Sequence, residues 1–229
     1  MTRVIVSKNE PITLVGGAPV GTKLLSEAIA IAPLTVAADG GAKVLLECDH
    51  DPLAVIGDMD SLPGDLQARI PENRIHHIAE QDSTDFEKCL SRITAPLIVG
   101  VGFLGGRIDH QMAVQSVLSR YAHHRCLLIG MYDAMCVVPP QFALDLPVGT
   151  RVSLFPMAPT KIASQGLQWP TEGLQFSQWT DRNIQPFNRK TDPCTAEQRD
   201  ADYSAAEICP TDCRGIALCT KMARSLTSR

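Results

Sequence analysis

Residues 53–61 read LAVIGDMDS, an apolar run that ends in two aspartates. Four consecutive apolar positions are typical of a strand buried on both faces, and such strands belong to parallel sheets. The same pattern, each time ending in Gly or Asp, recurs at ITLVGG (12–17), LTVAADGG (34–41), PLIVGVGFLGG (96–106) and CLLIG (126–130).

Helical patterns alternate with these runs, namely KLLSEAIAIA (23–32), KVLLEC (43–48) and an amphipathic stretch over 110–121. This alternation predicts an α/β fold with a doubly wound, mostly parallel, Rossmann-like sheet. In such sheets ligands bind beyond the carboxyl ends of the strands, which is where the Gly and Asp residues cluster here.

The pattern changes after Pro139-Pro140. ALDLPVGTRVSLFPM (143–157) alternates as a strand pair does around a Pro-Val-Gly-Thr turn, and GLQWPTEGLQF (166–176) predicts another short strand pair. We therefore expect an α/β domain over 1–138 and a smaller all-β domain over 139–229.

Composition excludes several function classes. The 229 residues include 21 Lys and Arg against 25 Asp and Glu, which gives a net charge of -4. The chain therefore lacks the excess of positive charge that is typical of nucleic-acid-binding proteins. No apolar run reaches about 18 residues, which argues against a membrane span. The stretch MTRVIVSKNE has no apolar signal-peptide region, so we expect a cytoplasmic protein.

The eight cysteines divide into two groups. Cys48, Cys89, Cys126 and Cys136 sit singly in apolar segments and are expected to be reduced and packed. The remaining four fall in the last 36 residues, without a Cys-x-x-Cys pair or a nearby His, so a zinc site is not favoured. The segment 177–229 is atypical, with one Gly, no Val and no alternating strand pattern. Two explanations stay open: a segment without regular structure, or a change of reading frame.

Six aspartates lie where predicted strands end, where a predicted helix begins or after a glycine pair: Asp39, Asp58, Asp60, Asp82, Asp85 and Asp109. Isolated aspartates cap helices and fill turns, but six at one expected sheet edge favour metal or phosphate chemistry. Oxygen ligands without Cys or His suit Mg²⁺. Asp82 and Asp85 are predicted on the first turn of one helix, capped by Ser83 or Thr84, with Lys88 one turn on.

Glycine pairs complete the predicted edge. Gly16-Gly17, Gly40-Gly41 and Gly105-Gly106 each follow a strand, and the last pair runs into Arg107, a natural bidentate phosphate donor. No P-loop, GxGxxG or GxSxG motif is present. The pairs His76-His77 and His123-His124 are predicted at the surface, whereas His110 adjoins Arg107 and Asp109.

Four motifs together resemble the thiamine pyrophosphokinase (thiamine diphosphokinase) family: DGGA (39–42), GDMDS (57–61), QDSTDFEKCL (81–90) and GGRIDH (105–110). The resemblance implies transfer of a pyrophosphoryl group from ATP to the hydroxyl of thiamine, with release of AMP. It also implies a Mg²⁺ requirement and a homodimer. The α/β domain (1–138) would be the ATP-binding catalytic domain, and the smaller all-β domain (139–229) would be a thiamine-binding β-sandwich. The family's Gly-x-Ser-Asn loop, expected after Phe176, is missing.

The matching positions give the candidate site. Asp58, Asp60, Asp82 and Asp85 are the candidate Mg²⁺ ligands, one of them a candidate proton acceptor, and Arg107 completes the catalytic set. The remaining candidates for binding ATP or thiamine are Asp39, Gly40, Gly41, Ser61, Gln81, Thr84, Lys88, Gly105, Gly106, Asp109, His110 and Trp169, the last either stacked on thiamine or packed in the core. Two alternatives stay open: a non-catalytic thiamine- or nucleotide-binding protein, and a related nucleotide-dependent phosphotransferase acting on another alcohol.

Overall fold

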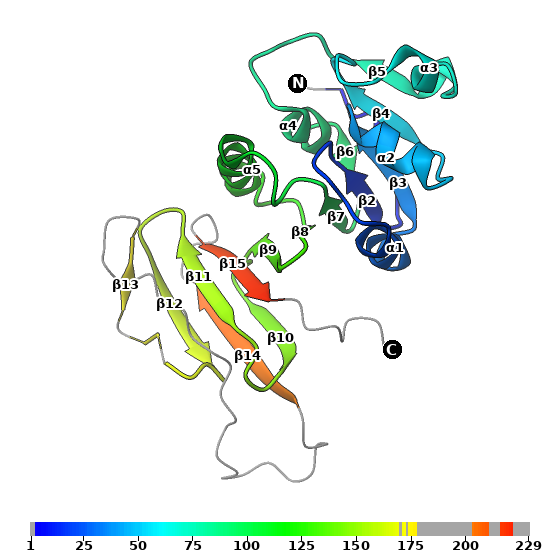
Figure 1. Ribbon diagram of the computed structural model, residues 1–229. Coiled ribbons are helices and arrows are strands. Elements are labelled where there is room, and N and C mark those ends of the chain that lie inside the picture. Colours follow the sequence, from blue (N-terminus) through cyan, green and yellow to red (C-terminus); the bar gives the residue numbers. More distant parts are fainter. Residues whose placement is uncertain (1–2, 170, 173, 178–202, 211–215, 222–229) are drawn as a thin grey trace. The chain divides into compact units, whose positions relative to one another are not determined.

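The computed structural model describes residues 3–169, 171–172, 174–177, 203–210 and 216–221. The chain forms two compact units, Met1–Met131 and Tyr132–Arg229. Figure 1 shows the first built from strands and helices and the second, where described, from strands. The first unit confirms the predicted α/β class. The boundary after Met131 precedes the predicted limit at residue 138, and β9 (Asp133–Val137) pairs with a strand of the second unit.

Two sets of parallel strands form the sheet of the first unit. Their pairing orders are β2-β7-β8 and β3-β4-β5, and β3 lies beside β2. The strands are β2 (Ile12–Val15), β3 (Leu34–Ala38), β4 (Ala54–Gly57), β5 (Ile75–His77), β7 (Ile98–Val101) and β8 (Cys126–Ile129). β2 is therefore flanked by β3 and β7, the arrangement in which winding reverses and ligands bind at the strand ends.

The helices of the first unit are α1 (Thr22–Ile31), α2 (Gly41–Glu47), α3 (Gly64–Gln67), α4 (Asp85–Leu90) and α5 (Ile108–Arg120), with a 3₁₀ turn at Glu72–Arg74. Two short strands, β1 (Val6–Ser7) and β6 (Ile93–Thr94), pair in parallel. The three predicted helical stretches correspond to α1, α2 and α5. No helix in the described residues is long and apolar enough to cross a membrane.

Close backbone contacts fix the carboxyl edge of this sheet. A Cβ on Gly41, the first residue of α2, would lie 2.0 Å from the carbonyl oxygen of Val15 at the end of β2. A Cβ on Gly102, which has φ +77°, would lie 2.5 Å from the carbonyl oxygen of Gly16. Only glycine permits such approaches, so the ends of β2, β3 and β7 meet closely.

The second unit contains two antiparallel groups of strands, in the orders β10-β14-β12-β13 and β11-β15-β9. Their bounds are β10 (Phe142–Pro147), β11 (Val152–Pro156), β12 (Thr160–Gln165), β13 (Gln175–Phe176), β14 (Tyr203–Pro210) and β15 (Ile216–Lys221). Buried and exposed residues alternate along β12, and the core includes Val138, Val152, Leu154, Ile162 and Phe176.

Two predictions for this unit are wrong. GLQWPTEGLQF does not form its own strand pair, because β13 pairs with the beginning of β12. The segment after 177, in which no strand pattern is recognisable, contains β14 and β15. Each lies between two other strands, so backbone pairing on both sides sustains it without a marked alternation in sequence. The reading-frame hypothesis stays a prediction.

The four cysteines predicted to be reduced are free, with Cys89 and Cys126 buried and Cys48 and Cys136 half-buried. Burial raises the pKa of the Cys136 thiol to about 12 and that of Cys89 further still, so both are neutral packing groups. The side chains of the other four cysteines lie outside the described residues.

Candidate active site

Three aspartates meet at the carboxyl edge of the first unit's sheet. Asp39 follows β3, and Asp58 and Asp60 follow the neighbouring strand β4. One carboxylate oxygen from each lies within 4.8 Å of the others. Asp39 is buried, Asp58 half-buried and Asp60 exposed, so this acidic group opens to solvent on one side.

Two oxygens of the acidic group fit a cation ligand set. Oδ1 of Asp39 and Oδ1 of Asp58 are buried and have no hydrogen-bond partner among the described residues. Buried carboxylate oxygens without a partner are costly, and a bound cation removes that cost. An all-oxygen donor set suits Mg²⁺. The acidic group therefore fits the predicted metal, with Asp39 added to the predicted ligands Asp58 and Asp60.

The backbone holds these carboxylates close together. Asp39 has φ +42°, and Met59, between the other two aspartates, has φ +63°. Both values lie in the left-handed region that residues other than glycine seldom adopt. A Cβ on Gly57 would lie 2.7 Å from Cβ of Asp39, so the close approach of β4 to Asp39 requires glycine at that position.

Lys88 supplies a buried positive charge beside the acidic group. Its side chain is 2% exposed, and Nζ lies 3.2 Å from Oδ2 of Asp58 and 3.2 Å from Oδ1 of Asp85. Burial opposes the charged form, but the hydrogen bonds to Asp85 and Asp58 outweigh it and raise the pKa of Lys88. Lys88 is therefore an ammonium that neutralises part of the acidic charge.

Asp58 and Asp85 differ in protonation although both contact Lys88. The hydrogen bond from Gln81, 2.9 Å between Nε2 and Oδ2, is the largest influence on Asp58 and lowers its pKa. Burial dominates at Asp85 and raises its pKa, and the nearby Asp39 and Asp58 charges add to the rise. Asp58 is thus held as a carboxylate, whereas Asp85 takes up a proton more readily.

The segment before α4 differs from its prediction. The helix begins at Asp85, so Asp82 does not share a first helical turn with it. Thr84 is the cap, accepting a hydrogen bond from the Glu87 N–H. Glu80 accepts the N–H of Asp82 at 3.0 Å and closes this loop. Asp82 is exposed and does not belong to the acidic group.

The glycine-rich segment after β7 carries a second pair of charged groups. Arg107 donates to Asp109 through Nε at 3.2 Å and through NH2, and this contact lowers the pKa of the Asp109 carboxyl to about 2. Both side chains are exposed, as is His110. Gly105, with φ +81°, donates its N–H to Gln111. Among the described residues, neither Arg107 nor Asp109 bonds to the acidic group.

Other predicted residues have varied surroundings. Ser61 donates to Oδ1 of Asp60 at 2.8 Å, and its Cβ would lie 3.2 Å from a Cβ on Gly40, so both adjoin the acidic group. Glycine is required at position 41 for packing, because a Cβ there would lie 2.0 Å from the carbonyl oxygen of Val15. Trp169 is 46% exposed and belongs to the second unit.

The sequence did not predict one set of contacts that position helix α4. Glu87, on α4, accepts two hydrogen bonds from Arg120 at 2.5 and 2.8 Å, and a third from the Tyr121 hydroxyl at 3.3 Å. These contacts tie α5 to the helix that carries Asp85 and Lys88. The residues are 33 and 34 positions apart, and no local pattern signals such a pairing.

Comparison with known proteins identifies this unit. Residues 25–129 match the family model described as thiamin pyrophosphokinase, catalytic domain, a range that includes the acidic group, Lys88 and Arg107. This match, the curated relatives and the solved structures all support the thiamine pyrophosphokinase family.

Curated family members show modest sequence identity. The chain is 26% identical over 180 residues to thiamine pyrophosphokinase 1 of Oryza sativa subsp. japonica, a match that covers 64% of this chain and 68% of that protein. It is 27% identical over 179 residues to thiamine pyrophosphokinase 1 of Arabidopsis thaliana, covering 63% and 67%.

Solved structures of thiamin pyrophosphokinases share the fold over nearly the whole chain. The protein from Geobacillus thermodenitrificans superposes with a TM-score of 0.71 at 22% identity, covering 94% of this chain and 99% of that one. The protein from Candida albicans gives 0.73 at 13% identity, covering 96% and 93%. At these identities the likeness concerns the fold.

Proposed function

We propose that the protein transfers a pyrophosphoryl group from ATP to the hydroxyl of thiamine, giving thiamine diphosphate and AMP. The observation that carries this function is the acidic group with its two unpartnered buried oxygens, which lies at the carboxyl edge of a family catalytic domain. Attack at the β-phosphorus builds charge on phosphate oxygens, so positioned cations and hydrogen-bond donors dominate catalysis.

Asp39, Asp58 and Asp60 are the proposed Mg²⁺ ligands. Mg²⁺ bound there offsets the charge of the ATP phosphates and of the group in transfer. Gln81 keeps Asp58 ionised and oriented, and Ser61 does the same for Asp60 through its hydroxyl. Asp82 lies apart from these three and is proposed at the mouth of the site.

Lys88, Asp85 and Arg107 are assigned to the remaining tasks. The buried Lys88 ammonium contributes positive charge beside the phosphate-binding edge. Asp85, whose pKa is raised by burial, is better suited than Asp58 to accept the proton of the thiamine hydroxyl. Arg107 presents an exposed guanidinium, which can leave Asp109 to bind phosphate. Thr84, Gly40, Gly41, Gly105, Gly106, Asp109 and His110 line the same proposed nucleotide site.

The second unit is the proposed thiamine-binding β-sandwich, with Trp169 as a stacking residue. Its predicted limits, 139–229, and those of the catalytic domain, 1–138, form part of this proposal. A homodimer follows from the family resemblance. The free, packed cysteines support a reducing, cytoplasmic location.

Mg²⁺-dependent release of AMP from ATP, measured with and without thiamine, tests the function. We expect the wild type to release AMP only when thiamine is present. In Asp58→Asn the rate of AMP release should fall at least about 100-fold, because the substitution removes the negative charge of a proposed Mg²⁺ ligand. Asp65→Asn is the matched control, because Asp65 is exposed on α3 outside the acidic group. Equal losses in the two variants would contradict the assignment.

The same assay separates the alternatives. Release of ADP, or activity with another alcohol in place of thiamine, would identify a related phosphotransferase. Saturable binding of thiamine without AMP release would identify a non-catalytic binding protein, the alternative favoured by the atypical segment after 177.

A further inference from the structure

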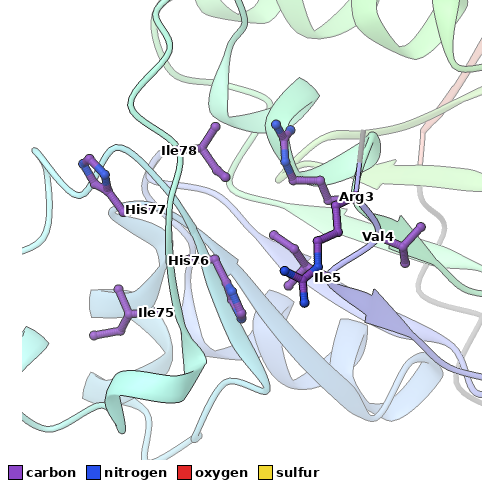
Figure 2. Close-up of a pocket in the computed structure, with 8 residues that line it drawn as sticks. Arg3, Val4, Ile5, Ile75, His76, His77 and Ile78 are labelled. Atoms are coloured by element: carbon purple, nitrogen blue, oxygen red, sulfur yellow. The ribbon is translucent and has the colours of Figure 1, made fainter. Parts of the chain in front are cut away.

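A cavity of about 760 Å³ lies beside the edge strand β5, and none of the acidic group lines it. Figure 2 shows Arg3, Val4 and Ile5 on one side and Ile75, His76, His77 and Ile78 on the other. Arg92, two residues beyond α4, completes the lining. The His76-His77 pair, predicted at the surface, thus forms part of a cavity wall, and His76 is half-buried.

The charged side chains that line this cavity are both guanidiniums, and its titratable side chains are both imidazoles. Arg3, His76, His77 and Arg92 line it, and no carboxylate does. Among the described residues, none of these four side chains forms an ion pair. In a chain with a net charge of -4, two guanidiniums and two imidazoles around one cavity without a counter-ion are a local excess of donors for an anion.

Arg92 is already fixed in place. Its NH1 donates to the carbonyl oxygen of Lys88 at 3.0 Å and to Oγ of Ser91 at 2.9 Å. A guanidinium held by such bonds loses little conformational freedom when it takes a ligand, and its planar fork matches a phosphate. The other half of the lining is aliphatic, from Val4, Ile5, Ile75 and Ile78.

We propose that this cavity binds a small organic anion that carries a phosphate group and an apolar body. The arginines and histidines contact the phosphate, and the aliphatic residues cover the apolar part. The site is separate from the proposed catalytic centre, and its existence does not depend on the proposed reaction.

Calorimetric titration in Mg²⁺-free buffer tests the proposal, with phenyl phosphate and inorganic phosphate as probes. We expect saturable binding of phenyl phosphate, about tenfold tighter than that of inorganic phosphate because the ring is buried against the aliphatic residues. Arg3→Gln and His76→Gln should each weaken phenyl phosphate binding about tenfold. Arg3 is exposed and its side chain makes no hydrogen bond or ion pair with another described residue, so Arg3→Gln carries the test even where His76→Gln impairs folding.

Arg69→Gln is the matched control, because Arg69 is exposed, lies in the same unit and does not line the cavity. It removes the same charge and should leave the affinity unchanged, while Arg3→Gln should retain the wild type's AMP-forming activity. No saturable binding, equal weakening by Arg69→Gln, or equal affinity for the two probes would overturn the proposal.

Discussion

Replacing Lys88 with Met tests whether one buried ammonium holds the acidic edge together. The substitution keeps most of the length of the side chain and removes its charge, leaving Asp58 and Asp85 without their shared partner. Breaking a buried ion pair by removing one member costs about 3–5 kcal/mol. Asp58 is 13% exposed and fits that case, whereas Asp85 is 37% exposed and its contact contributes little.

We therefore expect Lys88→Met to lower the free energy of unfolding by about 2–4 kcal/mol, a shift of roughly 1–2 M in the urea midpoint. Urea denaturation followed by circular dichroism measures it. Lys43→Met provides the matched control, since Lys43 and Glu47 form an exposed pair at 3.9 Å and the change there should stay within about 0.5 kcal/mol.

Mg²⁺ gives the same prediction a second readout. Without Lys88, the acidic group carries more uncompensated charge, so the metal should stabilise the variant more than the wild type. A Lys88→Met protein that unfolds within about 0.5 kcal/mol of the wild type, or that gains no more from Mg²⁺, would refute the reasoning.

Three further variants test other parts of the structure. Gly41→Ala should lower the free energy of unfolding by about 3 kcal/mol or more because its Cβ meets backbone, whereas Gly17→Ala, with open space around it, should be tolerated in the same denaturation assay. Burial lowers the pKa of His76, so the folded state resists protonation and the free energy of unfolding falls as the pH drops through 6.5. The urea midpoints at pH 7.5 and 5.5 should therefore differ less in His76→Gln than in the wild type. Arg120→Gln should cost about 0.5–1 kcal/mol in urea denaturation, because Glu87 loses two bonds from a partner that is 55% exposed, and Arg120→Lys should recover only part of it.

The carboxyl edge could be predicted because its signals are local. Apolar runs that end in Asp or Gly identify buried parallel strands and the residues at their ends. Asp58 and Asp60 followed from that pattern alone. The same pattern placed Asp39 at this edge, but its place among the candidate metal ligands depends on which strand lies beside β4, and the parallel pairing of β3 with β4 supplies that fact.

Several features could not be predicted for physical reasons. The i and i+3 spacing of Asp82 and Asp85 suits one helical face, but the backbone N–H of Asp82 bonds to Glu80 and the helix begins three residues later. The hydrogen bond from Lys88 to Asp58 joins residues that are 30 positions apart, and no local pattern signals such a contact. The two long strands after residue 200 depend on partners on both sides rather than on their own pattern.

Helix α4 connects these two kinds of feature. Its sequence motif identifies Asp85 and Lys88 as candidate site residues, but the position of these side chains depends on contacts with residues outside the motif. Glu87, on the same helix, is held by α5, while the carbonyl oxygen of Lys88 is held by Arg92. A ligand that engages Arg92 in the β5 cavity would therefore act on the helix that places Lys88 against Asp58. Phenyl phosphate binding should for this reason change the urea midpoint of the wild type more than that of Lys88→Met, whose contact with Asp58 is already lost.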